Sequence, residues 1–382
     1  MELSVIIVNF RVKLFLEQCL FSLEKALQHF TAEIIVVDNS PEEHTKSFLQ
    51  QRFPNVTVIE CSDNPGFAKA CNRGLTAANG KNILFLNPDT LLPGDIFEKT
   101  LPFLNGYPEI GSLGVKMLDG AGKFLPESKR GFPTIGVSFC KLAGLHRIFP
   151  RSKYFSRYYL GHLSPNRASP VDILSGAFML IKKEVLDKTG GFDERFFMYA
   201  EDIDLSYRIT TLGYLNYYYP DTPILHFKGE SSSRNREYYT RFYTAMQQFV
   251  QKYSGNNLHS RLLSLGIAFW ERLAFLSASP KTTTSAQPLN LRFSGDPLSR
   301  HRAAEILEQA GISIHPNPAA PETEVCCEGP AFSFKDIISH MERNPGRNYL
   351  IHAAESTSVV GSPDSSLQGW AIGGKEPHET RV

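Results

Sequence analysis

Three carboxylates lie within four residues in the segment 196–208, which reads FFMYAEDIDLSYR. Glu201, Asp202 and Asp204 directly follow an apolar, aromatic run. Because like charges raise one another's pKa and apolar neighbours exclude water, the cluster suits a base that works near neutral pH. A helix starting here would also favour acids in its first turn and would pair Asp204 with Arg208. That structural role does not explain why all three acids are crowded together, so we expect a catalytic site.

A second acidic element ends an apolar run upstream. The segment 84–90, LFLNPDT, places Asp89 in a turn behind Pro88. Hard cations such as Mg²⁺ or Mn²⁺ take one or two carboxylates together with substrate phosphates. His226, at the end of the run ILH, would complete such a site, and the basic loop that contains Arg234 could fold over a diphosphate. The alternative for Asp89 is stabilisation of a turn, and a lone histidine is more often structural.

Polar residues also follow two other predicted strands. Asp38 comes after the run IIVV, where its carboxylate could accept hydrogen bonds from a nucleotide or could cap the next helix. Asn64 and Gly66 precede a helix whose free N–H groups suit a phosphate or ribose oxygen, although an ordinary turn explains them as well. Asn72 lies further along that helix and could face the same site.

Strands and helices alternate in the segments that must position these groups. The pattern predicts strands at 3–10, 33–37, 56–60, 83–87, 171–182, 215–219 and 224–227, and helices at 14–30, 67–78, 201–212 and 238–253. Alternation predicts a mainly parallel α/β sheet covered by helices on both faces, with ligands beyond the carboxyl ends of the strands. Asp38, Asn64 and Asp89 all fall at or just past such ends.

Composition narrows the class of protein. The 382 residues are 42% hydrophobic, enough for a sizeable core, and the net charge of +1 argues against a nucleic-acid partner. Six cysteines without a CxxC pair favour a reducing, cytoplasmic compartment. The first residues, MELSVIIVNF, lack the pattern of a secretory signal, and no uninterrupted apolar run is long enough for a spanning helix.

The segment 117–170 is interpreted as a long excursion over the sheet edge. Its basic residues include Lys123, Lys129, Arg130, Lys141, Arg147, Arg151, Lys153 and Arg157. They suit a lipid-linked, phosphate-bearing acceptor at a bilayer surface, and a solvated loop explains them about as well. The apolar stripe of 258–276 would either dock on the protein or lie on a membrane surface.

Taken together, the segments resemble the inverting family 2 glycosyltransferases of the GT-A fold, especially the rhamnosyltransferase-like branch. The matching pieces are SVIIVNF, IIVVDNS, NPGFAKACNRG, ILFLNPD, VDILSGAFMLIKKEVLDKTGGFDERFFMYAEDIDLSYRI and ILHFKGES. Each piece is weak alone, but their order and spacing from residue 3 to residue 253 are highly specific. The resemblance covers a catalytic domain at 1–255. Outside it, the composition predicts an amphipathic helix and linker at 256–288 and a small α/β accessory domain of unknown role at 289–382.

The resemblance implies a role for each candidate residue. The nucleotide and donor sugar would be bound by Val8, Asn9, Asp38, Asn64, Gly66, Asn72, Asn87, Gly176, Ala177 and Arg234. Asp89 stands where the family's metal-binding DxD motif ends, and with His226 it would hold Mg²⁺ or Mn²⁺. Since Asn87 replaces the first acid of that motif, metal affinity would be modest. Asp202 would be the general base, with Glu201 beside it.

The activity implied is transfer, with inversion, of a sugar from dTDP-rhamnose or a UDP-sugar to a saccharide or lipid-linked saccharide in cell-surface polysaccharide synthesis. The enzyme would work in the cytoplasm or peripherally on the inner face of the membrane. A nucleotidyltransferase would carry a glycine-rich basic loop after the first strand, where this chain reads VNFRVKLFL. A non-catalytic nucleotide-sugar or lipid-phosphate binding protein would have no use for the acidic cluster.

Overall fold

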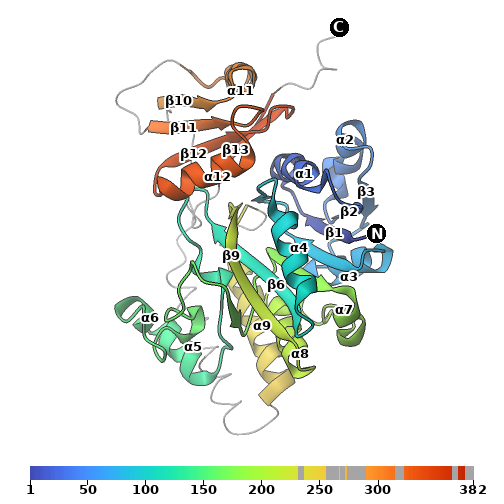
Figure 1. Cartoon of the computed structure of the whole chain (residues 1–382), viewed down its shortest axis with the longest axis vertical. Helices are drawn as coiled ribbons and strands as arrows, with labels where there is room; N and C mark the ends of the chain where they lie inside the picture. Colours follow the sequence, from blue (N-terminus) through green and yellow to red (C-terminus); the bar gives the residue numbers. More distant parts are fainter. Residues whose placement is uncertain are drawn as a thin grey trace.

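The computed structural model describes residues 1–230, 236–254, 266, 272, 290–314, 322–363 and 369–374. Within them, two β-sheets organise the chain (Figure 1). A nine-stranded sheet belongs to the N-terminal unit (1–254), and a five-stranded sheet belongs to the C-terminal unit (290–374). None of the helices in the described part of the chain is both long and apolar enough to cross a membrane.

The large sheet has the strand order β3-β2-β1-β4-β8-β6-β9-β5, with β7 paired to β9. Its strands are β1 Leu3–Asn9, β2 Ala32–Asp38, β3 Thr57–Glu60, β4 Asn82–Leu86, β5 Thr90–Leu91, β6 Ile110–Leu118, β7 Ser169–Val171, β8 Phe178–Lys182 and β9 Leu215–His226. The helices around it are α1 Lys13–Leu27, η1 Pro41–Glu43, α2 Thr45–Arg52, α3 Phe67–Ala77, α4 Ile96–Gly106, η2 Pro126–Ser128, α5 Ile135–Leu142, α6 Leu145–Ile148, η3 Arg157–Tyr159, α7 Lys183–Thr189, α8 Glu201–Thr211 and α9 Arg236–Ser254.

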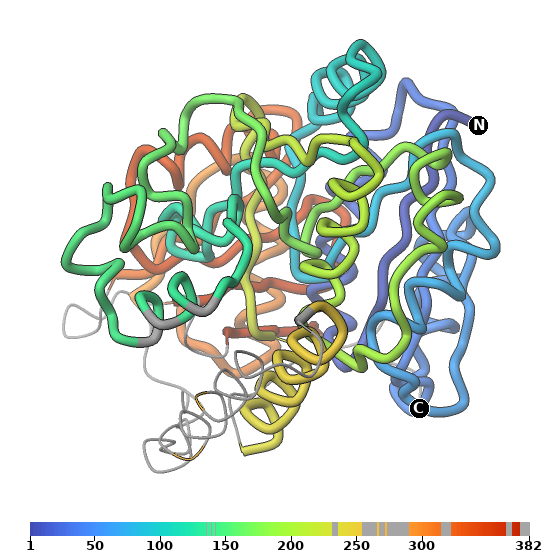
Figure 2. The backbone as a smooth tube through the Cα atoms, turned by 90° about the horizontal axis from the view of Figure 1, so that it is seen from below, coloured from blue at the N-terminus to red at the C-terminus, as the bar shows by residue number. Residues whose placement is uncertain are grey.

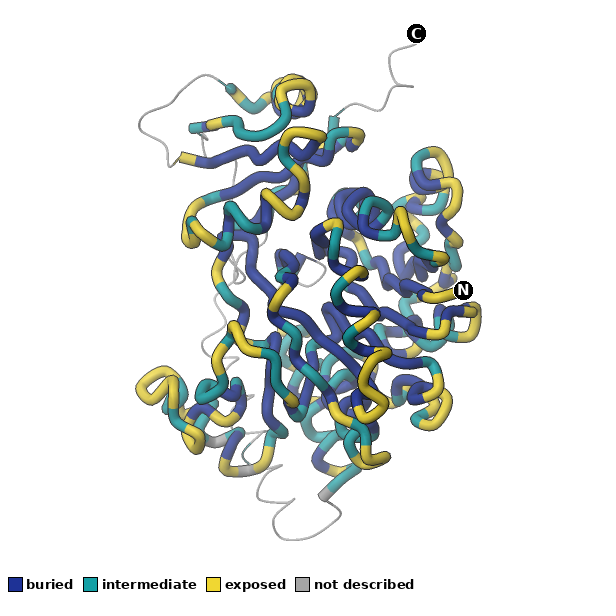
Figure 3. Tube along the Cα trace, viewed as in Figure 1, coloured by how far each residue is buried: buried dark blue, intermediate teal, exposed yellow. Residues whose placement is uncertain are grey.

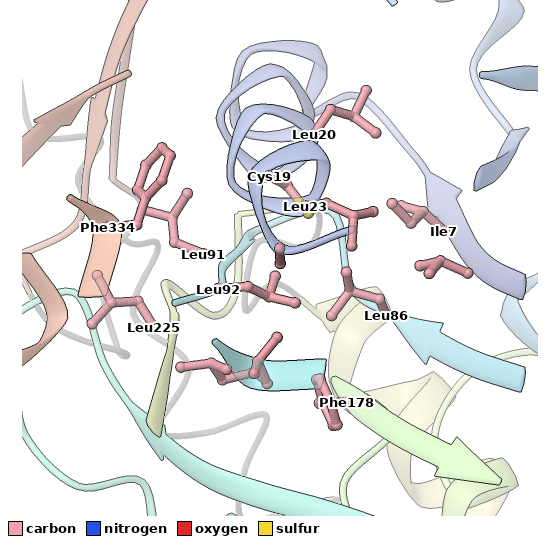
Figure 4. Packing of buried hydrophobic residues seen from close by; sticks show 14 of the residues in the cluster. Ile7, Cys19, Leu20, Leu23, Leu86, Leu91, Leu92, Phe178, Leu225 and Phe334 are labelled. Carbon is pink, nitrogen blue, oxygen red and sulfur yellow. The ribbon is translucent and has the colours of Figure 1, made fainter. Parts of the chain in front are cut away.

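The first half of this sheet is parallel, and its central strands β1 and β4 are buried on both faces, whereas the edge strand β3 is partly exposed. β3, β2, β1 and β4 pair in parallel, and all seven residues of β1 are buried. Successive side chains of a strand point to opposite faces, so Ile7 packs in one apolar cluster and Ile6 in the other. Leu23 of α1 points toward Ile7 and Leu86 on the first face (Figure 4). The predicted strands and helices of this half are confirmed.

The second half of the sheet is mixed, and here the predicted boundaries need correction. β8 runs antiparallel to β4 and β6, whereas β6 and β9 are parallel. The single strand predicted at 171–182 is two strands, β7 and β8, with a loop at 172–177 between them. The two strands predicted at 215–219 and 224–227 are one strand, β9. Its pairing with β6 shifts register across 220–223, where Pro220 and Pro223 offer no N–H to the ladder.

The C-terminal unit has the strand order β10-β11-β12-β13-β14, parallel in its first three strands. Its elements are β10 Asn290–Gly295, α11 Pro297–Gln309, β11 Glu322–Cys327, α12 Phe334–Arg343, β12 Asn348–His352, β13 Ser358–Gly361 and β14 Trp370–Gly373. Phe334 of α12 packs beside Leu91 of the large sheet, and both belong to one apolar cluster (Figure 4). The two units therefore share a core. The helix predicted at 258–276 and the linker after it lie almost wholly outside the described residues and stay predictions.

Candidate active site

Two adjoining cavities open beyond the strand ends of the large sheet. The acid cavity, about 420 Å³, is lined by Asp89, Glu201, Asp202 and His226 among others. The strand-end cavity, about 620 Å³, is lined by Val8, Asn39, Asn64 and Gly66 among others. Five residues line both cavities: Phe67, Asn87, Met198, Tyr199 and Tyr238. Asp89 and Asp202, which are far apart in sequence, thus line one cavity.

Helix α8 begins with the two acids of the cavity. Just before it, Tyr199 and Ala200 both have positive φ, at 70° and 62°. Such backbone strain in non-glycine residues is maintained only where the surroundings enforce it. The sharp turn aims the first residues of α8 at the cavity. Asp202 accepts hydrogen bonds on Oδ2 from Arg130 (2.5 Å) and from the Gly176 N–H (3.2 Å).

Arg130 is the partner that the sequence did not identify. It comes from the 117–170 excursion, where its charge suits a membrane contact, but the structure buries it and pairs it with Asp202. It also donates to the Leu174 carbonyl at 2.7 Å. Burial lowers the pKa of Arg130, but the Asp202 carboxylate and the Tyr158 side chain together raise it above its ordinary value, so the guanidinium stays charged. Lys129 is likewise buried, with its ammonium donating to the carbonyls of Tyr159 and Leu160.

Glu201 has a different environment from Asp202 although it is the next residue. Its side chain is buried, and Oε2 has no hydrogen-bond partner among the described residues. Burial, and then the negative charge of Asp202, raise the pKa of Glu201 to about 8. At neutral pH the Glu201 carboxyl is therefore mostly protonated. The third acid, Asp204, points away from the cavity and accepts hydrogen bonds from Arg208 (2.8 Å), the Tyr253 hydroxyl (2.6 Å) and Lys252.

Asp89 and His226 are brought together by strand pairing, since Thr90 of β5 lies opposite His226 of β9. The His226 Nε2 lies 3.4 Å from Asp89 Oδ1 and 3.2 Å from Asn87 Nδ2. In the described part of the chain, no group of three or more His, Cys, Asp or Glu side chains could enclose a metal ion. Two converging ligand atoms fit a Mg²⁺ or Mn²⁺ ion that takes its remaining ligands from phosphate and water.

The strand-end cavity is built around Gly66, whose φ of +90° and close neighbours exclude a side chain. A Cβ there would lie 2.5 Å from the Phe197 carbonyl oxygen. The Gly66 N–H donates to Asn64 Oδ1 at 3.1 Å, and the Phe67 N–H donates to the Phe197 carbonyl at 2.7 Å. These first N–H groups of α3 are therefore already engaged, while the Asn64 and Asn39 amides bond to each other at 3.2 Å on the cavity wall.

Several candidate residues lie beneath or beside the cavities instead of on their walls. Asn9 and Asp38 are fully buried and bond to each other at 2.9 Å. Asn72 bonds to both the N–H and the carbonyl of Phe192, so its amide fastens the chain ahead of α8. Direct contact of these three residues with a nucleotide stays a prediction. Arg234 lies outside the described residues.

The cavity walls also contain residues for which the sequence offered no motif. Gly176 and Ala177, which we expected, line the acid cavity in the loop that separates β7 from β8. Lys141 and Tyr158 join them from the excursion, with the Lys141 ammonium 3.5 Å from the centre of the Tyr158 ring. Arg241 of α9 lines the strand-end cavity. The only sequence signal for these residues was a general enrichment in basic and aromatic types.

Comparison with known proteins identifies the class. A family model described as "Glycosyltransferase like family 2" matches residues 2–245. The chain belongs to this family: it is a glycosyltransferase of the hexosyltransferase type with a GT-A-type fold. An N-acetylglucosaminyl-diphospho-decaprenol L-rhamnosyltransferase of Mycobacterium tuberculosis is 31% identical over 249 residues, which cover 61% of this chain and 78% of that protein.

Two further similarities are more distant. The rhamnosyltransferase WbbL of Escherichia coli is 27% identical over 168 residues, covering 43% of this chain and 58% of that protein. Among solved structures, a mannosyltransferase from Pyrobaculum calidifontis in complex with GDP-Man and Mn²⁺ is similar with a TM-score of 0.47 and 18% identity. That similarity covers 73% of this chain and 76% of the mannosyltransferase, and no residue role is transferred from it.

Proposed function

We propose that this chain is an inverting, rhamnosyltransferase-like enzyme of cell-surface polysaccharide synthesis. Its donor would be dTDP-rhamnose or a UDP-sugar, and its acceptor a saccharide or lipid-linked saccharide. The observation that carries the proposal is the shared cavity, which is lined by Asp202 and by the Asp89–His226 pair. The name of the mycobacterial relative, which specifies rhamnose and a diphospho-decaprenol acceptor, supports the choice of sugar and acceptor.

In this proposal Asp202 is the general base. Its Oδ2 accepts hydrogen bonds from Arg130 and from the Gly176 N–H, and among the described residues Oδ1 accepts only the N–H of Ile203, its own helix neighbour, at 2.8 Å. An ionised carboxylate offers about four lone-pair sites, so one remains for the acceptor hydroxyl. The acceptor oxygen attacks the anomeric carbon while its proton passes to Asp202. The bond from that carbon to the diphosphate oxygen breaks, and the diphosphate departs with the electron pair.

The donor would span the two cavities. Asn39 and Asn64 offer amide groups for the base or ribose in the strand-end cavity. The diphosphate would lie near Asn87, which lines both cavities, and the sugar would extend toward Gly176. A Mg²⁺ or Mn²⁺ ion held by Asp89 and His226 would supply positive charge to stabilise the departing diphosphate. Lys228 on the same wall is paired with Glu127, so its charge is partly neutralised.

Asp202→Asn tests the assignment. General base catalysis typically contributes ~10²–10⁴-fold to a rate, so we expect the rate of sugar transfer to fall by at least ~10²-fold. Thermal stabilisation by the nucleoside diphosphate should persist, because the strand-end cavity is unchanged. Asp187→Asn, at an exposed residue of α7, is a control for the loss of a helix carboxylate outside the cavity. Transfer by Asp202→Asn at the wild-type rate would remove Asp202 from the role of base, and binding without any transfer by the wild-type chain would favour a binding protein.

A further inference from the structure

We propose that the segment 144–157, here named the basic-aromatic lobe, docks on the surface of a bilayer that contains anionic lipids. The lobe comprises α6 and the turns that follow it up to η3. It projects at one side of the molecule, away from the C-terminal unit, and its outer turns are exposed (Figures 1 and 3). This proposal deepens the proposed function, because a lipid-linked acceptor would reach the enzyme from that surface.

Exposed apolar side chains are concentrated in the lobe. Of the ten large hydrophobic residues that are exposed in the described part of the chain, four fall within 148–155. They are Ile148, Phe149, Tyr154 and Phe155, with exposures of 67%, 48%, 83% and 39%. The rings of Phe149 and Phe155 lie 5.1 Å apart, so they form one patch. Contiguous exposed apolar side chains mark interaction sites, and aromatic rings favour the level of the lipid headgroups.

The charge of the surrounding chain has a single sign. Residues 128–171 contain eight Lys and Arg and no Asp or Glu. Four of these cations are exposed on the lobe: Arg147, Arg151, Lys153 and Arg157. Within the described residues, none of the four has a carboxylate at salt-bridge distance. A protein surface with unpaired cations around an apolar patch is complementary to anionic headgroups above hydrocarbon. If the lobe were only a solvent-exposed loop, its cations would be explained by contact with water, but its exposed aromatic patch would not.

The lobe continues directly into the wall of the acid cavity. Tyr158 and Tyr159 follow it directly, and both line the cavity that contains Asp202. The Gly131 N–H donates to the Tyr158 carbonyl at 2.9 Å, and the Lys129 ammonium fastens the Tyr159 carbonyl at 3.2 Å. In the view from below, this part of the chain lies to one side of the sheet (Figure 2). A bilayer touching the lobe would present its headgroups next to the cavity wall, where Lys141 also lies.

The test is flotation of the full-length chain with phosphatidylcholine vesicles, with and without about one third phosphatidylglycerol. Phe149→Ser/Tyr154→Ser removes the apolar contact, and Arg151→Ser/Lys153→Ser removes two cations. Each basic residue near an anionic surface is worth roughly fivefold in partitioning, so the charge variant should bind about 25-fold more weakly. Leu298→Ser, at an exposed residue of α11, is the matched control and should float like the wild type.

Transfer to a soluble saccharide acceptor is measured in parallel. It should be unchanged in both lobe variants, because none of the four substituted residues lines a cavity described here. Binding of the wild-type chain to anionic vesicles should also weaken as salt is raised. The proposal is overturned if the wild-type chain does not float, or if both lobe variants float as well as the wild type. The second result would place any membrane contact elsewhere in the chain, and a failed transfer assay with normal flotation would count against the proposed function alone.

Discussion

The pH dependence of stability offers a direct check on the acid cavity, because Glu201 has a pKa of about 8 when folded, compared with an ordinary value of 4.5. Below pH 4.5 the carboxyl is protonated in the folded and in the unfolded chain, so its ionisation does not affect stability. Between that pH and about 8 the unfolded chain releases the proton while the folded chain keeps it, so stability falls as pH rises. Above pH 8 the loss of stability is complete. The difference between the pKa of Glu201 in the folded chain and its ordinary pKa corresponds to up to about 5 kcal/mol in the free energy of unfolding.

Glu201→Gln should remove this dependence. Glutamine has the shape of the protonated acid but cannot ionise, so the variant and the wild type should unfold alike near pH 5. At pH 8.5 the variant should be the more stable by roughly 3–5 kcal/mol. The measurement is urea unfolding followed by circular dichroism across this pH range, with the difference between the two proteins plotted against pH.

Glu184→Gln is the control, because Glu184 is exposed on α7. The difference in unfolding free energy between this variant and the wild type should not change with pH. A flat difference for Glu201→Gln as well would refute the reasoning. It would mean that Glu201 is charged in the folded chain at neutral pH, and that its buried Oε2 has a partner such as water that stabilises the carboxylate. The division of roles between the two adjacent acids would then have to be abandoned.

Three further outcomes are expected. Arg130→Met leaves the Asp202 carboxylate without its buried partner, so the free energy of unfolding should fall by about 3–5 kcal/mol. An unchanged midpoint of urea unfolding would show that the ion pair does not form. Asp89→Asn should abolish the extra thermal stabilisation that Mn²⁺ gives in the presence of a nucleoside diphosphate; an undiminished shift would place the metal elsewhere. Phe334→Ala should cost about 3–5 kcal/mol and lower the melting temperature of the whole chain, whereas Leu298→Ala at an exposed site should change little.

The parallel half of the large sheet could be predicted from the sequence because its central strands, β1 and β4, are buried on both faces. Such strands appear as uninterrupted Val and Ile runs, and the polar residue that ends each run marks the ligand-binding edge. The mixed half was harder to predict. β9 is one strand although Pro220 and Pro223 interrupt its pattern, because a register shift against β6 lets residues 220–223 leave the ladder.

Side-chain partners separated by long stretches of sequence could not be predicted. The Arg130–Asp202 pair joins residues 72 positions apart, and the intervening excursion has no periodicity that fixes its path. The burial of Asp38 was also missed. Its position after a strand is correct, and its side chain is buried against Asn9, while the next residue, Asn39, lines the cavity. Contact of Asp38 with a nucleotide stays a prediction. Motif spacing locates a strand end but does not decide which side chain there faces the ligand.

The role of the C-terminal unit could not be predicted from the sequence. The contacts at one edge of its sheet limit where a ligand could bind to this unit. Ligands of parallel α/β sheets bind beyond the carboxyl ends of the strands. After β12, the Ala353 N–H donates to Gln18 of α1 at 2.9 Å, and after β11, Glu328 pairs with Lys25 of α1 at 2.5 Å. After β10, Asp296 caps α11 with its own carboxylate. The edge at which a small ligand would bind is therefore occupied by α1, whose other side packs on β1 and β4. Because Phe334 of α12 belongs to the same apolar cluster as residues of α1 and of the large sheet, a core substitution such as Phe334→Ala should be felt in both units.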